Sequence, residues 1–120
     1  MPARQKISAV DTAWLRMDRP TNLMMICGVL IFRERLSYAR LKRAVEDRFL
    51  QFKRFRQHPV QTAAGAFWED AGDFELEHHV VHVALPGKGG KRELQTLASR
   101  LAGTPLLPTR PLWQFHLVDN

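Results

Sequence analysis

Cysteine is nearly absent from this 120-residue sequence, in which Cys27 stands alone. A single cysteine cannot form an intramolecular disulfide, so the sequence does not have the character of a disulfide-stabilised extracellular domain. A reducing compartment is expected instead. Because Cys27 lies inside an apolar run, we predict that it is a small buried hydrophobic residue rather than a reactive thiol.

Long apolar segments are also absent. The longest run, Leu23 to Phe32, has ten residues, whereas a transmembrane helix needs about 20. The first six residues carry positive charge, but no apolar stretch follows them directly, and therefore no signal peptide is predicted. These absences favour a cytoplasmic protein, with any membrane or lipid-droplet association being peripheral.

The common catalytic and ligand-binding motifs are missing as well. The sequence has no Gly-x-Ser-x-Gly elbow, and the glycines between Gly87 and Gly90 lack the Gly-Lys-Ser/Thr ending of a P-loop and the spacing of a dinucleotide fingerprint. If Phe74 to Leu85 were one strand, His78 and His82 would lie about 13 Å apart, too far for one zinc ion. Neither a metal site nor a bound cofactor is expected.

Positive charge is concentrated in one segment. Residues 33–56 contain nine Lys or Arg and three Asp or Glu, which accounts for the whole net charge of +6. Few aromatic residues are interleaved with these charges, so no nucleic-acid partner is expected. Arg40, Arg43 and Lys53 are candidates for contact with an anionic membrane or lipid-droplet surface. The alternative is a solvated face without a partner.

The order of the expected elements predicts an α/β sandwich with a mixed sheet. Helical spacing or caps favour helices at 11–17, after Ser37, and at 91–101. The helix after Ser37 should turn Leu41, Val45, Phe49 and Phe52 to one face. Strands are expected at 24–33 (buried on both faces), in a hairpin over 60–68, at 74–85 and at 112–118. The last of these ends so close to Asn120 that we expect its partner to lie outside the chain.

Four segments of the sequence follow one another in an order that is typical of one protein family. Ser8-Ala-Val-Asp11 opens the first, and residues 22–32 form the second. The third combines Phe-Trp-Glu-Asp at 67–70 with residues 74–86, and the fourth is Arg-Pro-Leu-Trp at 110–113. Together they resemble the N-terminal part of bacterial wax ester synthase/diacylglycerol acyltransferases. The resemblance covers almost the whole chain.

The resemblance implies a fold and an activity. The fold would be part of a chloramphenicol-acetyltransferase-like, CoA-dependent acyltransferase sandwich, with residues 1–120 forming its N-terminal part, truncated before the family's His-His-x-x-x-Asp-Gly motif. The intact enzyme would make triacylglycerol or wax esters from acyl-CoA, a co-substrate, and diacylglycerol or a long-chain alcohol. Its partners would include the remainder of the acyltransferase fold.

The resemblance also assigns roles to residues. No catalytic residue is expected in this chain, because His78-His79 is followed by Val83 and Ala84 where the motif needs Asp and Gly. Family-motif residues Pro111, Leu112 and Trp113 would either shape an acyl tunnel or brace the strand before the catalytic loop. His79 and His82 are expected to make structural hydrogen bonds.

Two alternatives stay open from the sequence. One is a condensation-type domain of the same superfamily, and the other is a non-catalytic basic binding module. The chain also departs from the family pattern at Leu107 and Gln114, where acidic residues are common, and at Val81, where a basic residue is common. These departures bear on substrate preference rather than on the family.

Overall fold

The strands form two separate sheets in the computed structural model, which describes residues 4–119. One sheet is antiparallel and has the order β1-β3-β2, from Gln5–Lys6, Gly65–Asp70 and Gln57–Thr62. The other pairs β4 (Val80–Ala84) with β5 (Phe115–Asp119) in parallel. The predicted α/β class is confirmed, and parallel and antiparallel pairing both occur, but in different sheets.

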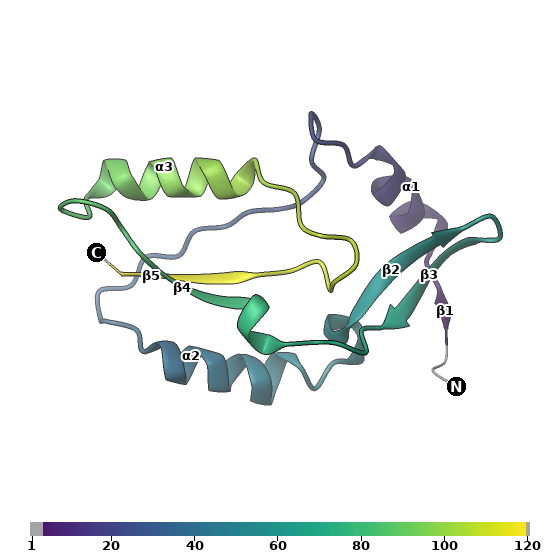
Figure 1. Cartoon of the computed structure of the whole chain (residues 1–120), viewed down its shortest axis with the longest axis horizontal. Helices are drawn as coiled ribbons and strands as arrows, with labels where there is room; N and C mark the ends of the chain where they lie inside the picture. The colour runs from purple at the N-terminus through teal and green to yellow at the C-terminus, as the bar shows by residue number, and fades with distance from the viewer. Residues whose placement is uncertain (1–3, 120) are drawn as a thin grey trace.

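The parallel pair is joined by a helical crossover. Helix α3 (Lys91–Ala102) follows β4 and precedes β5, as neighbouring parallel strands require a long connection. In Figure 1, α3 lies on one side of the two strands and α2 (Tyr38–Ala44) on the other. Val80 lies opposite Phe115, and Ala84 lies opposite Asp119. The expectation that the last strand lacks a partner is therefore wrong, because β4 pairs with it.

Helix α2 begins as its sequence predicts. The Ser37 hydroxyl accepts a hydrogen bond from the Arg40 N–H at 3.4 Å and caps the first turn. The helix then widens into a π-helical turn, η1 (Val45–Phe49). Leu41, Val45 and Phe49 face the core as expected. Phe52 does not, because the helix has ended before it, and its side chain is exposed.

The core between α2 and the parallel sheet is small. Val80 is fully buried, and Val45 and Leu76 join it in one cluster. Partly buried side chains surround these three residues, from α2, η1, the loops and the segment before β5. They are Tyr38, Leu41, Phe49, Leu50, Phe74 and Trp113.

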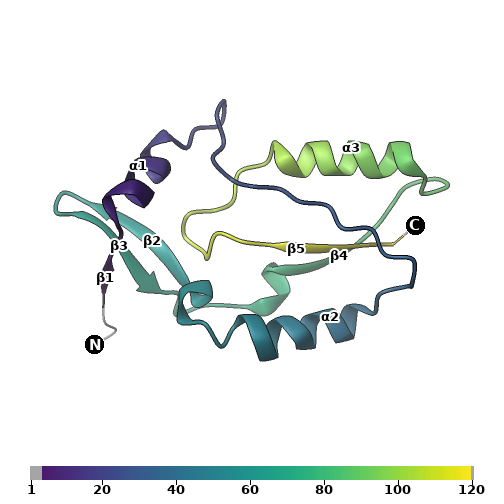
Figure 2. The same cartoon turned by 180° about the vertical axis from the view of Figure 1, so that it is seen from behind.

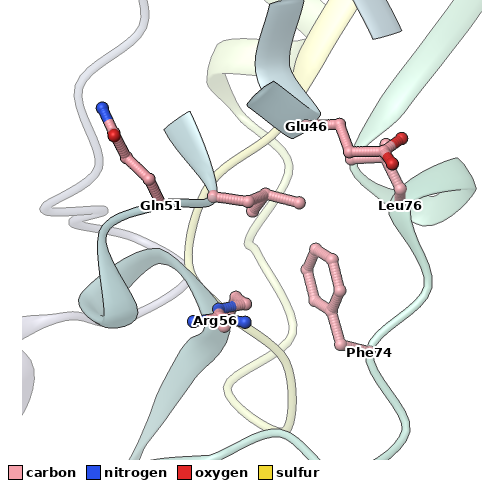
Figure 3. A pocket seen from close by; sticks show the side chains of 6 residues that line it. Glu46, Gln51, Arg56, Phe74 and Leu76 are labelled. Carbon is pink, nitrogen blue, oxygen red and sulfur yellow. The ribbon is translucent and has the colours of Figure 1, made fainter. Parts of the chain in front are cut away.

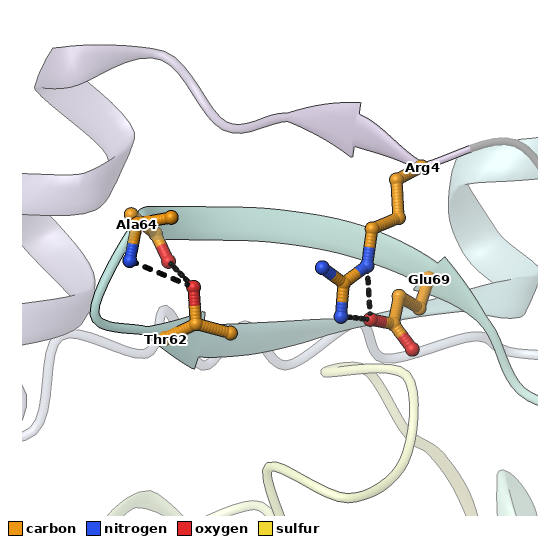
Figure 4. A network of polar contacts seen from close by, with 5 residues as sticks. Arg4, Thr62, Ala64 and Glu69 are labelled. Carbon is orange, nitrogen blue, oxygen red and sulfur yellow. Dashed lines mark hydrogen bonds and ion pairs between the residues drawn. The ribbon is translucent and has the colours of Figure 1, made fainter.

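The antiparallel sheet forms the other end of the molecule. Gly65 begins β3 with a φ of 128°, a conformation that favours glycine, and the Thr62 hydroxyl accepts from the Ala64 N–H at 3.2 Å (Figure 4). Arg4, directly before β1, forms an ion pair with Glu69 in β3. The predicted hairpin is confirmed.

The Ser-x-x-Asp opening has a structural explanation. The Ser8 hydroxyl accepts the Asp11 N–H at 3.2 Å and caps helix α1 (Ala9–Met17). Asp11 lies in the first turn, where a negative charge is favourable. The predicted helix at 11–17 is confirmed and begins two residues earlier.

The predicted strand at 24–33 is not formed within this chain. The segment is extended, but no strand of residues 4–119 pairs with it. Its apolar side chains are consequently exposed, Ile26 to 96%. Cys27 is also exposed, so the prediction that it is buried is wrong for the same reason.

The predicted long strand at 74–85 is interrupted. Leu76–His78 form a 3-10 turn, η3, in which the His79 N–H donates to the Leu76 carbonyl at 2.9 Å. Only Val80–Ala84 is a strand. The premise that His78 and His82 share one strand is therefore wrong. Helix α3 confirms the helix predicted at 91–101.

Candidate functional site

The Pro-Leu-Trp segment and His79 meet where β4 and β5 begin. Pro111 is buried, and Leu112 and Trp113 are half-buried just before β5. Rings from η1, η2 (Lys53–Arg56), the loop before η3 and both strand starts gather around Trp113. We call this group the aromatic cluster: Phe49, Phe55, Phe74, His79, Trp113 and Phe115.

Trp113 connects the segment before β5 to η2. Its indole Nε1–H donates to the Phe55 carbonyl oxygen at 2.7 Å. Its ring lies 4.8 Å from the Phe49 ring and 5.8 Å from the Phe115 ring, between centroids. Aromatic pairs at such distances and tilts contribute packing energy beyond their buried area. Trp113 is thus held through both its ring and its polar atom.

His79 connects the same segment to β4. Its side chain is buried, and its Nδ1 lies 2.8 Å from the Trp113 carbonyl oxygen. A carbonyl oxygen only accepts, so Nδ1 carries the proton. In return, the Phe115 N–H donates to the His79 carbonyl at 2.7 Å. The imidazole ring lies 4.6 Å from Trp113 and 5.0 Å from Phe74, between centroids.

Burial lowers the pKa of His79 below the ordinary histidine value of 6.5. The hydrogen bond to the Trp113 carbonyl acts in the opposite direction, and the nearby charge of Arg110 adds to the lowering. Burial also lowers the pKa of His116. A neutral His79 with its proton on Nδ1 therefore suits this packing position.

His82 lies apart from the aromatic cluster. Its exposed side chain places Nε2 2.5 Å from the Asp119 Oδ2, joining β4 to the end of β5. Its ring stacks on Tyr38 at 5.3 Å between centroids, and the Tyr38 hydroxyl donates to the Val80 carbonyl at 2.6 Å. The structure therefore joins His79, and not His82, to Trp113.

The three candidate membrane-contact residues are exposed. Arg40 and Arg43 lie on α2 and Lys53 lies in η2, and within residues 4–119 none of them forms an ion pair. Their neighbour Lys42 does, with the Glu77 carboxylate at 2.6 Å, which raises the pKa of Lys42. No helix in this same range combines the length and apolarity needed to cross a bilayer.

Two open cavities flank η1. The larger, of about 590 Å³, has Glu46 above and both Arg56 and Phe74 below (Figure 3). The smaller, of about 270 Å³, is almost entirely apolar and is bounded by α2, η1, η2 and β5. Its lining residues are Leu41, Ala44, Val45, Arg48, Phe49, Phe52, Phe55 and Phe115. None of the sequence-predicted site residues lines either cavity.

The site is arranged to position a strand. His79 Nδ1 is hydrogen-bonded to a carbonyl oxygen, and its ring packs against the rings of Phe74 and Trp113. His82 is paired with Asp119, but neither lines a cavity. Within residues 4–119 no group of three or more His, Cys, Asp or Glu side chains is placed to hold a metal ion.

Sequence reasoning missed the partners of these residues. Tyr38 and Asp119 carried no local signal, and the Phe55 group used by Trp113 is a backbone carbonyl. Asp119 could have been found from the register of β4 and β5, since Leu117 lies opposite His82. That register depends on a parallel pairing between residues 35 apart in the sequence, which short-range patterns do not reveal.

Comparisons of the sequence and of the structure with known proteins indicate the same family. Residues 7–119 match the family model described as the wax ester synthase/diacylglycerol acyltransferase catalytic domain. A Mycobacterium tuberculosis protein named as a probable diacylglycerol O-acyltransferase, tgs3, is 35% identical over 96% of this chain and 45% of its own length. A second protein of that organism, named as a putative diacylglycerol O-acyltransferase, is 30% identical over 98% of this chain and 25% of its own length.

A solved structure shares the fold. It is the wax ester synthase/diacylglycerol acyltransferase from Marinobacter aquaeolei VT8, with a TM-score of 0.68 and 19% identity. The match covers 95% of this chain and 29% of that one. The chain thus spans less than half the length of each of these similar proteins.

The buried His79 predicts a pH dependence of stability. Because its pKa is lowered on folding, the unfolded chain binds more protons than the folded chain between that lowered pKa and 6.5. Its contribution is complete above 6.5 and is lost as the pH falls through this window. Urea denaturation should therefore show stability decreasing from about pH 7 to about pH 5.5.

The substitution His79→Asn separates titration from hydrogen bonding. Asparagine can still donate to the Trp113 carbonyl, but it has no ring to pack against Phe74 and Trp113, so the variant should be less stable at neutral pH. Because asparagine does not titrate, the stability of the variant should also depend less steeply on pH. His116→Asn should remove a further part of the slope, because burial lowers that pKa too. A slope that His79→Asn leaves unchanged contradicts this interpretation.

Proposed function

The chain belongs to the wax ester synthase/diacylglycerol acyltransferase family, and from this we propose that it is the N-terminal part of an acyl-CoA-dependent O-acyltransferase. The observation that carries the proposal is the family match over residues 7–119, nearly the whole chain. The intact enzyme would join the acyl group of acyl-CoA to diacylglycerol or a long-chain alcohol. Its products would be triacylglycerol, wax esters or both.

In this proposal the chemistry resides outside the present residues. The sequence contains no His-His-x-x-x-Asp-Gly motif, so the general base would come from the remainder of the acyltransferase fold. That base takes the proton of the acceptor hydroxyl, whose oxygen attacks the thioester carbonyl. The new C–O bond replaces the C–S bond, and CoA leaves as a thiol after receiving the proton.

The described residues would position β5 for the intact site. Trp113 uses its Nε1 for the Phe55 carbonyl and packs its ring against Phe49 and Phe115, which supports bracing over tunnel lining. Pro111 is buried directly before it. His79 supports the same bracing role through the Trp113 carbonyl, and His82 supports the pairing of β4 and β5 through Asp119.

The alternatives are narrowed by the family match. A condensation-type domain is disfavoured, because the matched family is the wax ester synthase/diacylglycerol acyltransferase catalytic domain. A non-catalytic basic binding module is the outcome to expect if the intact protein forms no ester.

The first test concerns activity. The 120-residue chain alone should transfer no acyl group, since it lacks the base that contributes about 10²–10⁴-fold and part of the substrate-binding surface. Acyl-CoA with hexadecanol or diacylglycerol is the substrate pair, and release of the CoA thiol is followed. Co-expression with the C-terminal remainder of tgs3, which begins after its aligned region, should restore ester formation.

Size-exclusion chromatography accompanies this assay. The exposed apolar side chains at 26–32 should make the chain alone associate or precipitate. Ester formation by the monomeric chain alone would show that the general base lies within these 120 residues, contrary to the proposal. Absence of ester from a folded, co-expressed complex would contradict the proposed activity.

The second test concerns an anionic membrane or lipid-droplet surface, which we propose as a contact of Arg40, Arg43 and Lys53. Each charge near such a surface contributes about 1 kcal/mol, screened over about 10 Å at about 0.1 M salt. Replacing all three by Glu should greatly reduce co-sedimentation with phosphatidylserine-containing vesicles. Added salt should reduce the binding of the unmodified chain.

A matched control variant changes the same charge elsewhere. Arg19, Lys88 and Arg92 are also exposed, and replacing them by Glu should have a smaller effect. Equal loss in both variants would indicate a response to net charge alone. Co-sedimentation that neither added salt nor the first variant reduces would refute the membrane contact.

A further inference from the structure

Residues 24–33, which we call the unpaired segment, are extended and apolar yet uncovered. Ile26 is 96% exposed, Leu30 83% and Ile31 82%. Val29 and Phe32 are also more than half exposed. Figure 2 shows the segment as an extended trace crossing the molecule from α1 to α2. No strand among residues 4–119 pairs with its backbone.

The pattern of side chains is that of an interior strand. In an extended chain, Ile26, Leu30 and Phe32 point to one side, and Val29 and Ile31 point to the other. Both sides are therefore apolar, whereas a strand at the surface of a sheet alternates apolar and polar residues. The segment needs cover on both faces and hydrogen bonds for its backbone.

A lipid surface satisfies only part of this need. An unpaired extended backbone is costly in hydrocarbon, because its N–H and C=O groups find no partners there. Segments that lie in a membrane interface also keep one polar face, which residues 26–32 lack. The occupant should therefore be protein that supplies strands.

The family fold offers such a protein. The chain aligns over 96% of itself with tgs3 but over 45% of that protein, and over 95% of itself with the Marinobacter structure but over 29% of that chain. Most of the fold thus lies outside the present residues. Strand β5 also pairs only with β4 within the described part of the chain, so it offers a second open edge.

We propose that the unpaired segment becomes an interior strand by pairing with the polypeptide that supplies the remainder of the acyltransferase fold. This inference rests on the part of the proposed function that places the chain in a larger acyltransferase. It does not depend on ester formation. Pairing through the backbone gives affinity, and the apolar side chains on both faces join the shared core.

Hydrogen exchange tests the proposal directly. The chain is purified alone and after co-expression with the C-terminal remainder of tgs3. The backbone amides of residues 26–32 should exchange rapidly in the chain alone, kept dilute enough to remain monomeric, and at least about 100-fold more slowly in the complex, as expected for strands inside a sheet. Fast exchange of these amides in a folded complex would overturn the proposal, and so would failure of the two polypeptides to associate.

Substitutions identify the surface responsible. Ile26→Lys with Leu30→Lys should weaken association at least about tenfold, since both side chains would enter the shared core. The control is Val10→Lys with Leu107→Lys, at two other exposed apolar positions, which should change association less than the first pair. All four positions are exposed, so circular dichroism should show the chain's own fold retained. Equal effects of the two pairs would contradict the assignment.

The experiments give different results for each rival partner of the unpaired segment and for the proposed activity. Slow exchange at 26–32 in a concentrated chain alone, with dimer formation, would assign the segment to a second copy. Slow exchange only with phosphatidylserine vesicles would assign it to lipid. A protected complex that forms no ester refutes the proposed activity but leaves this inference standing, and an active complex with unprotected amides does the reverse.

Discussion

Two hydrogen bonds of Trp113 to residues distant in sequence are the constraint on which the arrangement of this chain depends. Its indole reaches the Phe55 carbonyl in η2, and its own carbonyl holds the His79 ring at the start of β4. Elements far apart in sequence are thereby joined at one residue, directly before β5. Since the core contains few fully buried side chains, this junction adds to the backbone pairing of β4 and β5 in holding the two strands together.

This arrangement gives the family-motif residues a structural role, that of holding β5 in place. Pro111, Trp113 and His79 pack, donate and accept among themselves, and the neutral state of His79 suits that role. In the proposed function, positioning and chemistry belong to different parts of the family fold. The present residues hold the strand, and the remainder would supply the base. The unpaired segment at 24–33 fits the same proposal, since its partner strands would also lie in the remainder of the fold.

Features set by neighbouring residues could be predicted from the sequence. Ser8 and Ser37 cap helices, the 91–102 segment is helical, and Gly65 forms the turn of a hairpin, because each depends on local geometry. Features that need a distant partner could not. The β4–β5 pairing, the Phe55 carbonyl and the missing cover of Ile26 all depend on chain segments that no local pattern identifies. The interruption at Leu76–His78 was missed because alternation alone does not distinguish a 3-10 turn from a strand.

The most direct test of the central claim is the free energy of unfolding of Trp113→Phe, measured by urea denaturation at low protein concentration. This change keeps an aromatic ring but removes the Nε1 donor, leaving the Phe55 carbonyl without its partner. The expected loss is about 1–3 kcal/mol. The same change at the exposed Trp14 should cost no more than about 0.5 kcal/mol. A loss confined to Trp113→Phe supports the account, whereas equal losses, or none at Trp113, would contradict it.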